Sequence, residues 1–345
     1  MAGLRKILRA PAGRITNQAL FVALVLVFGT GVATVAIGSS SGRWAAIAHG
    51  AAGLVILLLV PWKGRVVRGG LRRGRATRWM SLLLAGLVVI TFGAGVGYAT
   101  GLVRSIAGRP GLWVHIAVAL VLVPLVLWHL VARRIRPRRS DLSRRTFLRA
   151  GLLGAGAAGL YFAAGEAVRL GGLPGAGRRF TGSYETGSFD PDAMPVTSWL
   201  VDPVPAVDPD RWRLTVADGT GRYQLDLDEL ATSGVLMRAT LDCTSGWYAR
   251  QDWSGVPVKA LLHGTGQARS LLVHSVTGYW IRFPVSDVGR LLLATHVGGA
   301  PLSAGHGYPL RLVAPGRRGY WWVKWVDRIE LQATPWWWQP PFPVT

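Results

Sequence analysis

Cysteine is almost missing from this chain, which has one, Cys243, among 345 residues. A single thiol excludes an internal disulfide, so Cys243 is either an inert buried residue or a single thiolate ligand to a metal. Motifs of several other chemistries are also absent: the sequence contains no Cys-x-x-Cys, Walker loop, Gly-x-Ser-x-Gly or His-Glu-x-x-His pattern. The residues around Cys243 therefore become the main guide to function.

Acidic residues are scarce in the first half of the chain. Residues 1–177 contain 23 Lys and Arg but only two acids, Asp141 and Glu166, whereas residues 178–345 contain 16 Lys and Arg against 15 acids. The net charge of +22 therefore belongs to the first half. Such a charge is typical of nucleic-acid binding, but here the basic residues stand between long apolar runs. We therefore expect no nucleic-acid partner.

Four apolar segments, at about residues 18–38, 44–62, 79–100 and 111–132, are each long enough to cross a bilayer as a helix. The loops after the second and fourth segments are rich in Lys and Arg, which marks the cytoplasmic side, so both ends of this four-helix unit are expected in the cytoplasm. The two basic clusters are Lys63, Arg65, Arg68, Arg72, Arg73, Arg75 and Arg78, and Arg133, Arg134, Arg136, Arg138, Arg139, Arg144, Arg145 and Arg149.

The stretch Ser143-Arg144-Arg145-Thr146-Phe147-Leu148-Arg149 resembles a twin-arginine export signal, and a Gly/Ala-rich apolar run, Ala150 to Val168, follows it. The alternative is a basic flank on an ordinary fifth helix. Either interpretation sends the rest of the chain across the membrane, with this helix kept as an anchor. Because the twin-arginine route exports folded proteins, the resemblance implies that the exported part carries a cofactor.

The sequence thus divides into a four-helix transmembrane domain (1–140), a signal or anchor helix (141–170), a Gly-rich linker (171–182) and a second domain (183–345). The second domain alternates strand-like runs, such as 212–216 and 271–276, with Asp/Gly/Pro turns. Short helices are expected at 227–231 and 257–263. The fold class is therefore an α-helical membrane bundle followed by a mixed α+β domain.

Several stretches of the second domain resemble the sulfite-oxidase-type molybdopterin-binding domain, which is shared by sulfite oxidases, plant nitrate reductase and a bacterial periplasmic methionine-sulfoxide reductase. The match runs in order over about 150 residues, so it is stronger than any single motif. It comprises Met194 to Leu200, Trp212 to Val216, Cys243 to Trp247, Trp253 to Val258, Gly278 to Trp280, Gly299 to Leu302, His306 to Val313 and Lys324 to Ile329.

The resemblance implies that Cys243 supplies the protein thiolate to molybdenum, a soft ligation that leaves the thiol deprotonated. Arg311 and Lys324 occupy positions where the family holds the pterin phosphate. The alternatives are a small buried hydrophobe for the cysteine and solvated strand charges for the two cations. Weaker candidates are His306, Thr197 and Ser198 for cofactor contacts, and Tyr279, Arg250 and Arg282 for the catalytic site, where the two arginines could attract an anionic substrate.

Two histidines of the apolar segments, His49 and His115, stand near the outer ends of the second and fourth segments. Ligand-type residues in spanning helices are functional candidates, and two imidazoles at one depth could ligate one b-type haem. The alternative is hydrogen bonding to backbone or interfacial water. His129 is 14 residues from His115, or ~21 Å along a helix, so we expect an interfacial role near the inner surface.

These observations predict a membrane-anchored molybdenum oxidoreductase of a bacterial cell membrane, with its C-terminal domain outside the cytoplasm. It would transfer oxygen atoms and exchange electrons with a membrane haem b and the quinone pool. Its substrate would be sulfite, methionine sulfoxide or another small S- or N-oxide, and the direction of transfer stays open. Two rival hypotheses are the same catalytic domain on a haem-free anchor and a non-catalytic membrane-tethered binding protein.

Overall fold

The computed structural model describes residues 13–71, 78–132, 138, 141, 143–198, 203–231 and 234–340. Much of both basic clusters lies outside the described residues, as do Trp199 and Leu200 of the family-like stretch. Contacts between residues divide the chain into two compact units. Unit 1 comprises Met1–Ala36 and Ser40–Gly182, and unit 2 comprises Ile37–Ser39 and Ser183–Thr345.

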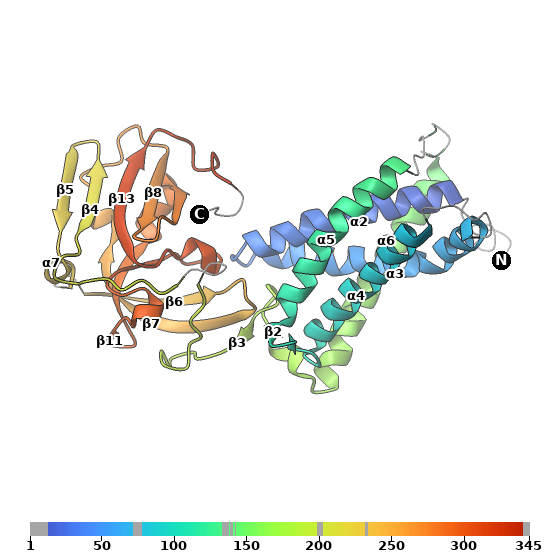
Figure 1. Cartoon of the computed structure of the whole chain (residues 1–345), viewed down its shortest axis with the longest axis horizontal. Helices are drawn as coiled ribbons and strands as arrows, with labels where there is room; N and C mark the ends of the chain where they lie inside the picture. The colour runs from blue at the N-terminus through green and yellow to red at the C-terminus, as the bar shows by residue number, and fades with distance from the viewer. Residues whose placement is uncertain are drawn as a thin grey trace. The chain divides into compact units, whose positions relative to one another are not determined.

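Among its described residues, unit 1 has five helices that are long and apolar enough to cross a membrane (Figure 1). Long runs of Leu, Val and Ala favour helices whose apolar side chains point outward on every face, as lipid requires. The helices are α2 (Gly13–Ala36), α3 (Gly42–Leu71), α4 (Arg78–Thr100), α5 (Gly111–Ala132) and α6 (Arg144–Leu170). They correspond to the four expected segments and the expected anchor.

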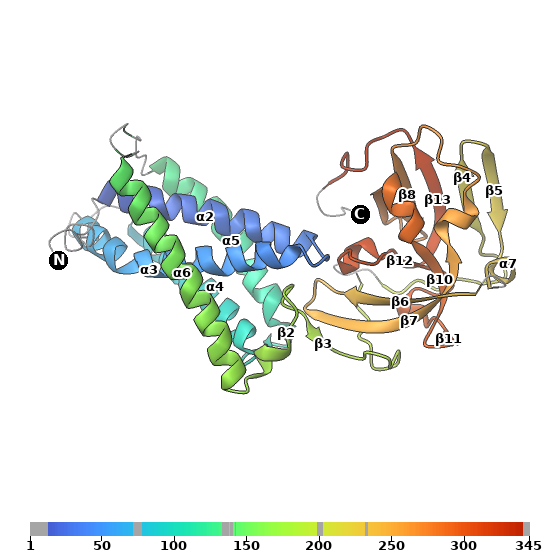
Figure 2. The same ribbon diagram turned by 180° about the vertical axis from the view of Figure 1, so that it is seen from behind.

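The helices of unit 1 pack mainly in pairs. Helix α2 packs on α3, α4 packs on α5, and α6 lies against α3, as Figure 2 shows from behind. A short hairpin of β1 (Ser105–Ile106) and β2 (Arg109–Pro110) joins α4 to α5. This pairing places the second and fourth apolar segments in different helix pairs, which matters for the two histidines described below.

Helix α6 begins within the twin-arginine-like stretch. Ser143 is its N-cap, and the Ser143 hydroxyl accepts a hydrogen bond from the Thr146 N–H at 3.3 Å. Arg144 and Arg145 are exposed in the first turn. Just before the cap, the buried Asp141 carboxylate accepts hydrogen bonds from Arg14 and from Gln18 Nε2 at the start of α2.

Unit 2 contains two β-sheets and little helix. One sheet joins β3 (Tyr184–Glu185), β6 (Val235–Asp242), β7 (Trp247–Pro257), β10 (Leu292–Val297), β11 (Ala300–Pro301) and β12 (Arg311–Val313). The other has the order β5-β4-β13-β8-β9, with bounds Gly221–Leu225, Leu214–Asp218, Val326–Gln332, Ser270–Ser275 and Trp280–Pro284. Within that sheet β13 pairs parallel to β4 and antiparallel to β8.

The core of unit 2 lies among these strands. It is one cluster of buried hydrophobic residues drawn from the sequence between Met194 and Ile329. Alternation of buried and exposed residues is clear in β7, whose side chains point alternately into the core and out of it. Helix α7 (Leu227–Ala231) lies where the sequence predicts it, whereas the second expected helix is a 3-10 turn, Val258–Leu261. The mixed α/β prediction therefore fits, with strands outweighing helices among the described residues.

Candidate functional site

Cys243 lies at the tip of the hairpin that joins β6 to β7. The two strands pair antiparallel up to Asp242 and Tyr248, and the Cys243 N–H donates to the Trp247 carbonyl at 2.9 Å. Gly246 closes the turn with φ +97°, a left-handed conformation that a side chain disfavours. The thiol is therefore fixed by paired strands on both sides, although it sits in a turn.

A cavity that is partly open to solvent adjoins this turn. Its wall brings together residues that are more than a hundred positions apart in the sequence, from Pro195 to Trp325. The sequence-predicted residues that line it are Thr197, Ser198, Cys243, Tyr279, His306, Arg311 and Lys324. The family-like stretches thus converge on one cavity.

Two cations face this cavity, Arg311 from a buried position and Lys324 from a half-buried one. Arg311 is 3% exposed, its Nη1 donates to the His306 carbonyl at 2.9 Å, and its Nε has no hydrogen-bond partner. Lys324 Nζ donates to the Gly305 carbonyl at 2.6 Å. Neither forms an ion pair with a carboxylate in the part of the chain that the structure describes. Buried cations without a counter-charge are costly, so the cavity is suited to an anionic group.

The cost of burying these two cations appears as a lowered pKa of each side chain. Burial lowers the pKa of Arg311 to about 10. Burial, together with the neighbouring guanidinium, lowers the pKa of Lys324 to about 7. The Arg311 guanidinium lies over the rings of Trp253 and Trp322, at 5.5 and 5.8 Å from their centroids, which holds it in place and partly offsets the burial.

His306 supports this wall through both ring nitrogens. Its Nε2 donates to the Met194 carbonyl at 3.1 Å, and its Nδ1 accepts from the Ser303 hydroxyl at 2.9 Å, the roles of a neutral imidazole. Burial and the cations Arg311 and Lys324 lower the pKa of His306, which favours this neutral form. The His306 carbonyl, which accepts a hydrogen bond from Arg311 Nη1, therefore helps to position Arg311.

Two polar side chains of the cavity are fixed by neighbours. The Trp247 indole N–H donates to the Thr197 hydroxyl at 3.0 Å, and the Tyr279 hydroxyl donates to the Tyr320 carbonyl. Ser198 lines the same wall and is half-buried. These contacts leave Tyr279 with its proton engaged, so its oxygen can act toward the cavity only as an acceptor.

Arg250 and Arg282, predicted as catalytic, do not line the cavity. Arg250 alternates with the buried Ala249 and Gln251 along β7, so it points to the opposite face, where it pairs with Glu185 at 2.7 Å. Arg282 Nε donates to Gln332 Oε1 at 3.0 Å. Both arginines were predicted as cations that could attract an anionic substrate, and their side chains lie away from the cavity.

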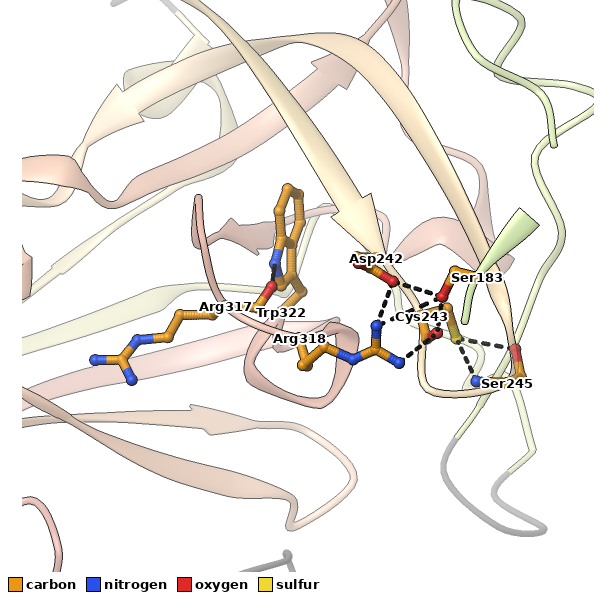
Figure 3. A network of polar contacts seen from close by, with 7 residues as sticks. All are labelled: Ser183, Asp242, Cys243, Ser245, Arg317, Arg318 and Trp322. Atoms are coloured by element: carbon orange, nitrogen blue, oxygen red, sulfur yellow. Dashed lines mark hydrogen bonds and ion pairs between the residues drawn. The ribbon is translucent and has the colours of Figure 1, made fainter. Parts of the chain in front are cut away.

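A buried ion pair behind the cysteine was not predicted from the sequence. Arg318 Nη1 donates to Asp242 Oδ1 at 2.5 Å, and Arg318 Nη2 donates to the Cys243 carbonyl at 3.2 Å (Figure 3). The Ser183 hydroxyl donates to the same Asp242 oxygen at 2.6 Å. In the sequence, the only sign of this ion pair was Asp242, an acid next to the single cysteine. Arg318 stands in a Gly-rich turn and looks like a surface residue there.

Unit 1 holds the second group of predicted residues. The imidazoles of His49 in α3 and His115 in α5 have ring centroids 6.0 Å apart. His49 Nδ1 bonds the Val27 carbonyl at 3.0 Å, and His115 Nδ1 bonds the Thr91 carbonyl at 2.8 Å. Because a carbonyl only accepts, each Nδ1 carries the proton and each Nε2 keeps its lone pair, the tautomer suited to metal binding.

Glycines on the neighbouring helices make room for these rings. A Cβ at Gly31 of α2 would lie 3.3 Å from His49 Cε1, and one at Gly95 of α4 would lie 2.9 Å from His115 Nδ1. His129 lies in the last turn of α5, its ring 6.4 Å from that of Trp128. The structure thus brings His49 and His115 together, whereas His129 lies at the other end of α5 from His115.

Comparison with known proteins identifies the chemistry of unit 2. Residues 201–338 match the family described as oxidoreductase molybdopterin binding domain. Mitochondrial sulfite oxidase of Homo sapiens is 28% identical over 167 residues, which cover 38% of this chain and 31% of that protein. The NADPH nitrate reductase of Phytophthora infestans is 34% identical over 96 residues, covering 23% of this chain and 10% of that protein.

A further match is to the NADPH nitrate reductase of Mycosarcoma maydis, 54% identical over 41 residues, or 12% of this chain and 4% of that protein. Among solved structures, the sulfane dehydrogenase SoxCD from Paracoccus pantotrophus is 23% identical, with a TM-score of 0.36, covering 38% of this chain and 40% of that chain. The chain spans about a third or less of the length of these curated relatives.

These matches coincide with the cavity that holds Cys243, Arg311 and Lys324, although Thr197 and Ser198 lie just before the matched range. Unit 2 therefore contains a molybdopterin-binding oxidoreductase domain related to sulfite oxidase and nitrate reductase, which supports an oxidoreductase enzyme. The expectation of an enzyme with a molybdenum cofactor is confirmed.

Proposed function

We propose that this protein is a membrane-anchored molybdenum oxidoreductase that transfers an oxygen atom to or from a small substrate outside the cytoplasm. The observation that supports this most directly is the position of Cys243, at a hairpin tip beside a cavity whose two cations, Arg311 and Lys324, form no ion pair with a carboxylate among the described residues. No group of three or more His, Cys, Asp or Glu side chains with metal-site geometry occurs in the described ranges. Cys243 would therefore share the metal with ligands from the cofactor itself.

The residues of the cavity fit such a cofactor. The unpartnered Arg311 Nε and the ammonium of Lys324 offer donors to an anionic phosphate, and their positive charges would be balanced by it. Cys243 would bind the metal as a thiolate, and Thr197 and Ser198 would offer hydroxyl contacts to the pterin. When bound there, molybdenum supplies two-electron oxygen-atom transfer.

The charges of the cavity favour a neutral substrate. Arg311 and Lys324 are the cationic side chains among its described lining residues, and in this proposal the cofactor phosphate engages both. Arg250 and Arg282 lie outside it. Sulfite would then meet an aromatic and hydroxyl-lined wall without a free cation, whereas a sulfoxide or N-oxide needs only hydrogen-bond donors. We therefore place small S- and N-oxides ahead of sulfite as substrates.

Metal analysis of the purified full-length chain tests this function. We expect about one molybdenum per chain in the wild type and none in Cys243→Ser, because a hydroxyl is a poor replacement for a soft thiolate. The matched control is Arg250→Gln, whose side chain lies outside the cavity and should leave the metal content unchanged. Absence of molybdenum from the wild type would contradict the enzyme hypothesis and favour a membrane-tethered binding protein.

For electron exchange, we propose a b-type haem between His49 and His115. The centroids of the two imidazole rings lie 6.0 Å apart, so both side chains are near enough to hold one haem iron between them. Their protonated Nδ1 atoms and the glycines opposite them support the same assignment. The haem would pass single electrons between the membrane quinone pool and the molybdenum domain.

An optical spectrum of the same preparation tests the haem. We expect a Soret band in the wild type that is lost in His49→Ala and in His115→Ala and retained in His129→Ala. If neither loss occurs while a band is present, the ligand assignment is wrong. If the wild type contains molybdenum but has no Soret band, the catalytic domain stands on a haem-free anchor and takes its electrons from a separate protein.

A further inference from the structure

The turn that carries Cys243 also carries a hydroxyl aimed at its sulfur. Ser245 Oγ lies 3.0 Å from Cys243 Sγ, and the Ser245 N–H lies 3.5 Å from the same atom (Figure 3). Both residues are buried, at 8% exposure each. A metal-bound thiolate has no proton to give, so within this pair the Ser245 hydroxyl must be the donor.

We propose that Ser245 is a positioning residue for the metal-binding thiolate, and that its hydroxyl raises the reduction potential of the metal bound to Cys243. Hydrogen bonds to a ligating sulfur withdraw electron density from it, which stabilises the lower oxidation states of the metal. This inference rests on the proposed function of Cys243 as a metal ligand. Its further claim is that the polar residue two positions later sets the potential of the site.

A donor tunes a metal only if it is held still, and the structure contains the means to hold it. Arg318, Asp242 and Ser183 form a fully buried network behind the turn, at 1%, 2% and 0% exposure. Arg318 contacts both the Asp242 carboxylate and the Cys243 carbonyl, and the Ser183 hydroxyl bonds Asp242 and approaches the Cys243 carbonyl at 3.3 Å. The network therefore fixes the backbone on the cysteine side of the turn.

The opposite side of the turn is fixed by the strands. The Gly246 N–H donates to the Cys243 carbonyl at 3.2 Å, and the Cys243 N–H donates to the Trp247 carbonyl. The Cys243 carbonyl thus receives donors from Gly246 and from Arg318. With the backbone held on both sides, the Ser245 hydroxyl reaches Sγ without a change of turn conformation.

Potentiometric titration of the molybdenum-loaded full-length chain, followed by electron paramagnetic resonance of the half-reduced metal, tests the inference. We expect Ser245→Ala to retain molybdenum, to shift the midpoint potential to a lower value and to change the g-values. The matched control is Ser245→Thr, which keeps a hydroxyl at the same position and should restore the wild-type potential. Arg318→Gln should broaden the resonance, because the turn loses its anchor.

The outcomes separate this inference from the function on which it rests. A Ser245→Ala protein with full molybdenum content and an unchanged potential overturns the tuning role and leaves the enzyme proposal intact. Loss of molybdenum in Ser245→Ala that Ser245→Thr restores supports a hydroxyl that holds the thiolate, whereas loss in both overturns it. A wild-type chain without molybdenum overturns the inference together with the proposed function.

Discussion

The buried cations of the cavity are the residues whose energetics depend most on what binds there. Lys324 has a folded-state pKa of about 7, against 10.5 for the free side chain, because burial and the Arg311 guanidinium disfavour its charged form. An anionic phosphate would reverse this effect by favouring the ammonium. The protonation of Lys324 is therefore a reporter of cofactor occupancy.

We expect the cofactor-free full-length chain to become more stable as the pH rises from about 7 toward 10. Between the folded pKa of about 7 and the unfolded value of 10.5, the unfolded chain binds the additional proton at Lys324, so the free energy of unfolding increases with pH. Thermal unfolding of cofactor-free protein from pH 6 to 10 measures this slope. The slope should be absent from Lys324→Met and reduced by the cofactor, and parallel curves for the two cofactor-free proteins would contradict the assignment.

At the residue scale the sequence predicts the candidate metal ligand and the two cations of the cavity better than their surroundings. Cys243, Arg311 and Lys324 stand in stretches that resemble a known family, and the structure brings them to one cavity. Arg250 is near Cys243 in the sequence, but nearness in sequence does not determine on which face of strand β7 its side chain lies. Arg318 is 75 residues from Cys243 and pairs with Asp242 only through the tertiary fold.

The helices of unit 1 show how small residues make room for the histidine rings of the proposed haem site. Gly95 in α4 faces the His115 ring of α5 so closely that a Cβ would lie 2.9 Å from Nδ1, whereas nothing lies within 4 Å of a Cβ at Gly93 of the same helix. Alanine is a better helix former than glycine by about 1 kcal/mol. The change from Gly to Ala affects helix propensity alike at Gly93 and Gly95. A defect caused by Ala at only one of these positions therefore cannot come from helix propensity.

We expect Gly95→Ala to weaken haem binding and to shift or diminish the Soret band, because the new methyl group displaces the His115 imidazole and breaks its bond to Thr91. Gly93→Ala should leave the spectrum as in the wild type. Haem content per chain and the Soret position, recorded in detergent, give the measurement. Equal spectra for both variants would show that the ring tolerates the contact and would remove the steric argument for the site.

Apolar length is enough to predict the long helices of unit 1, since a helix satisfies its own backbone hydrogen bonds in lipid. The strand boundaries of unit 2 are less accurate: the run at 212–216 begins as a strand only at Leu214, where the chain joins the sheet. The expected helix at 257–263 shortens to a 3-10 turn because Pro257 ends strand β7 immediately before it. Contacts between strands decide such details, and they are not local in sequence.

For the whole molecule, the interpretation of the Arg144-Arg145 pair decides by which route the proposed export of unit 2 would take place. Both side chains are exposed on the first turn of α6, where an export receptor could read them. We expect the double substitution Arg144→Lys, Arg145→Lys to retain unit 2 in the cytoplasm, because a lysine preserves charge but lacks the planar guanidinium. Protection of unit 2 from protease added to spheroplasts is the measurement.

The matched control for export is Arg178→Lys, Arg179→Lys, a second adjacent pair that lies in the linker after α6. It should leave unit 2 accessible to the protease. If the pair at 144 and 145 behaves in the same way, α6 is an ordinary anchor with a basic flank. The membrane assignment would survive that result, but the reason to expect export of a folded, cofactor-loaded domain would be lost.

The residues that line the cavity are widely separated along the chain, so they are translated at different times. Its wall requires Thr197 at one end of unit 2 and Lys324 and Trp325 at the other, with the hairpin of Cys243 between them. A ribosome has therefore translated all five apolar helices, and nearly all of unit 2, before the last wall residues emerge. In the proposed enzyme the cofactor would therefore be loaded only after all five apolar helices have been translated.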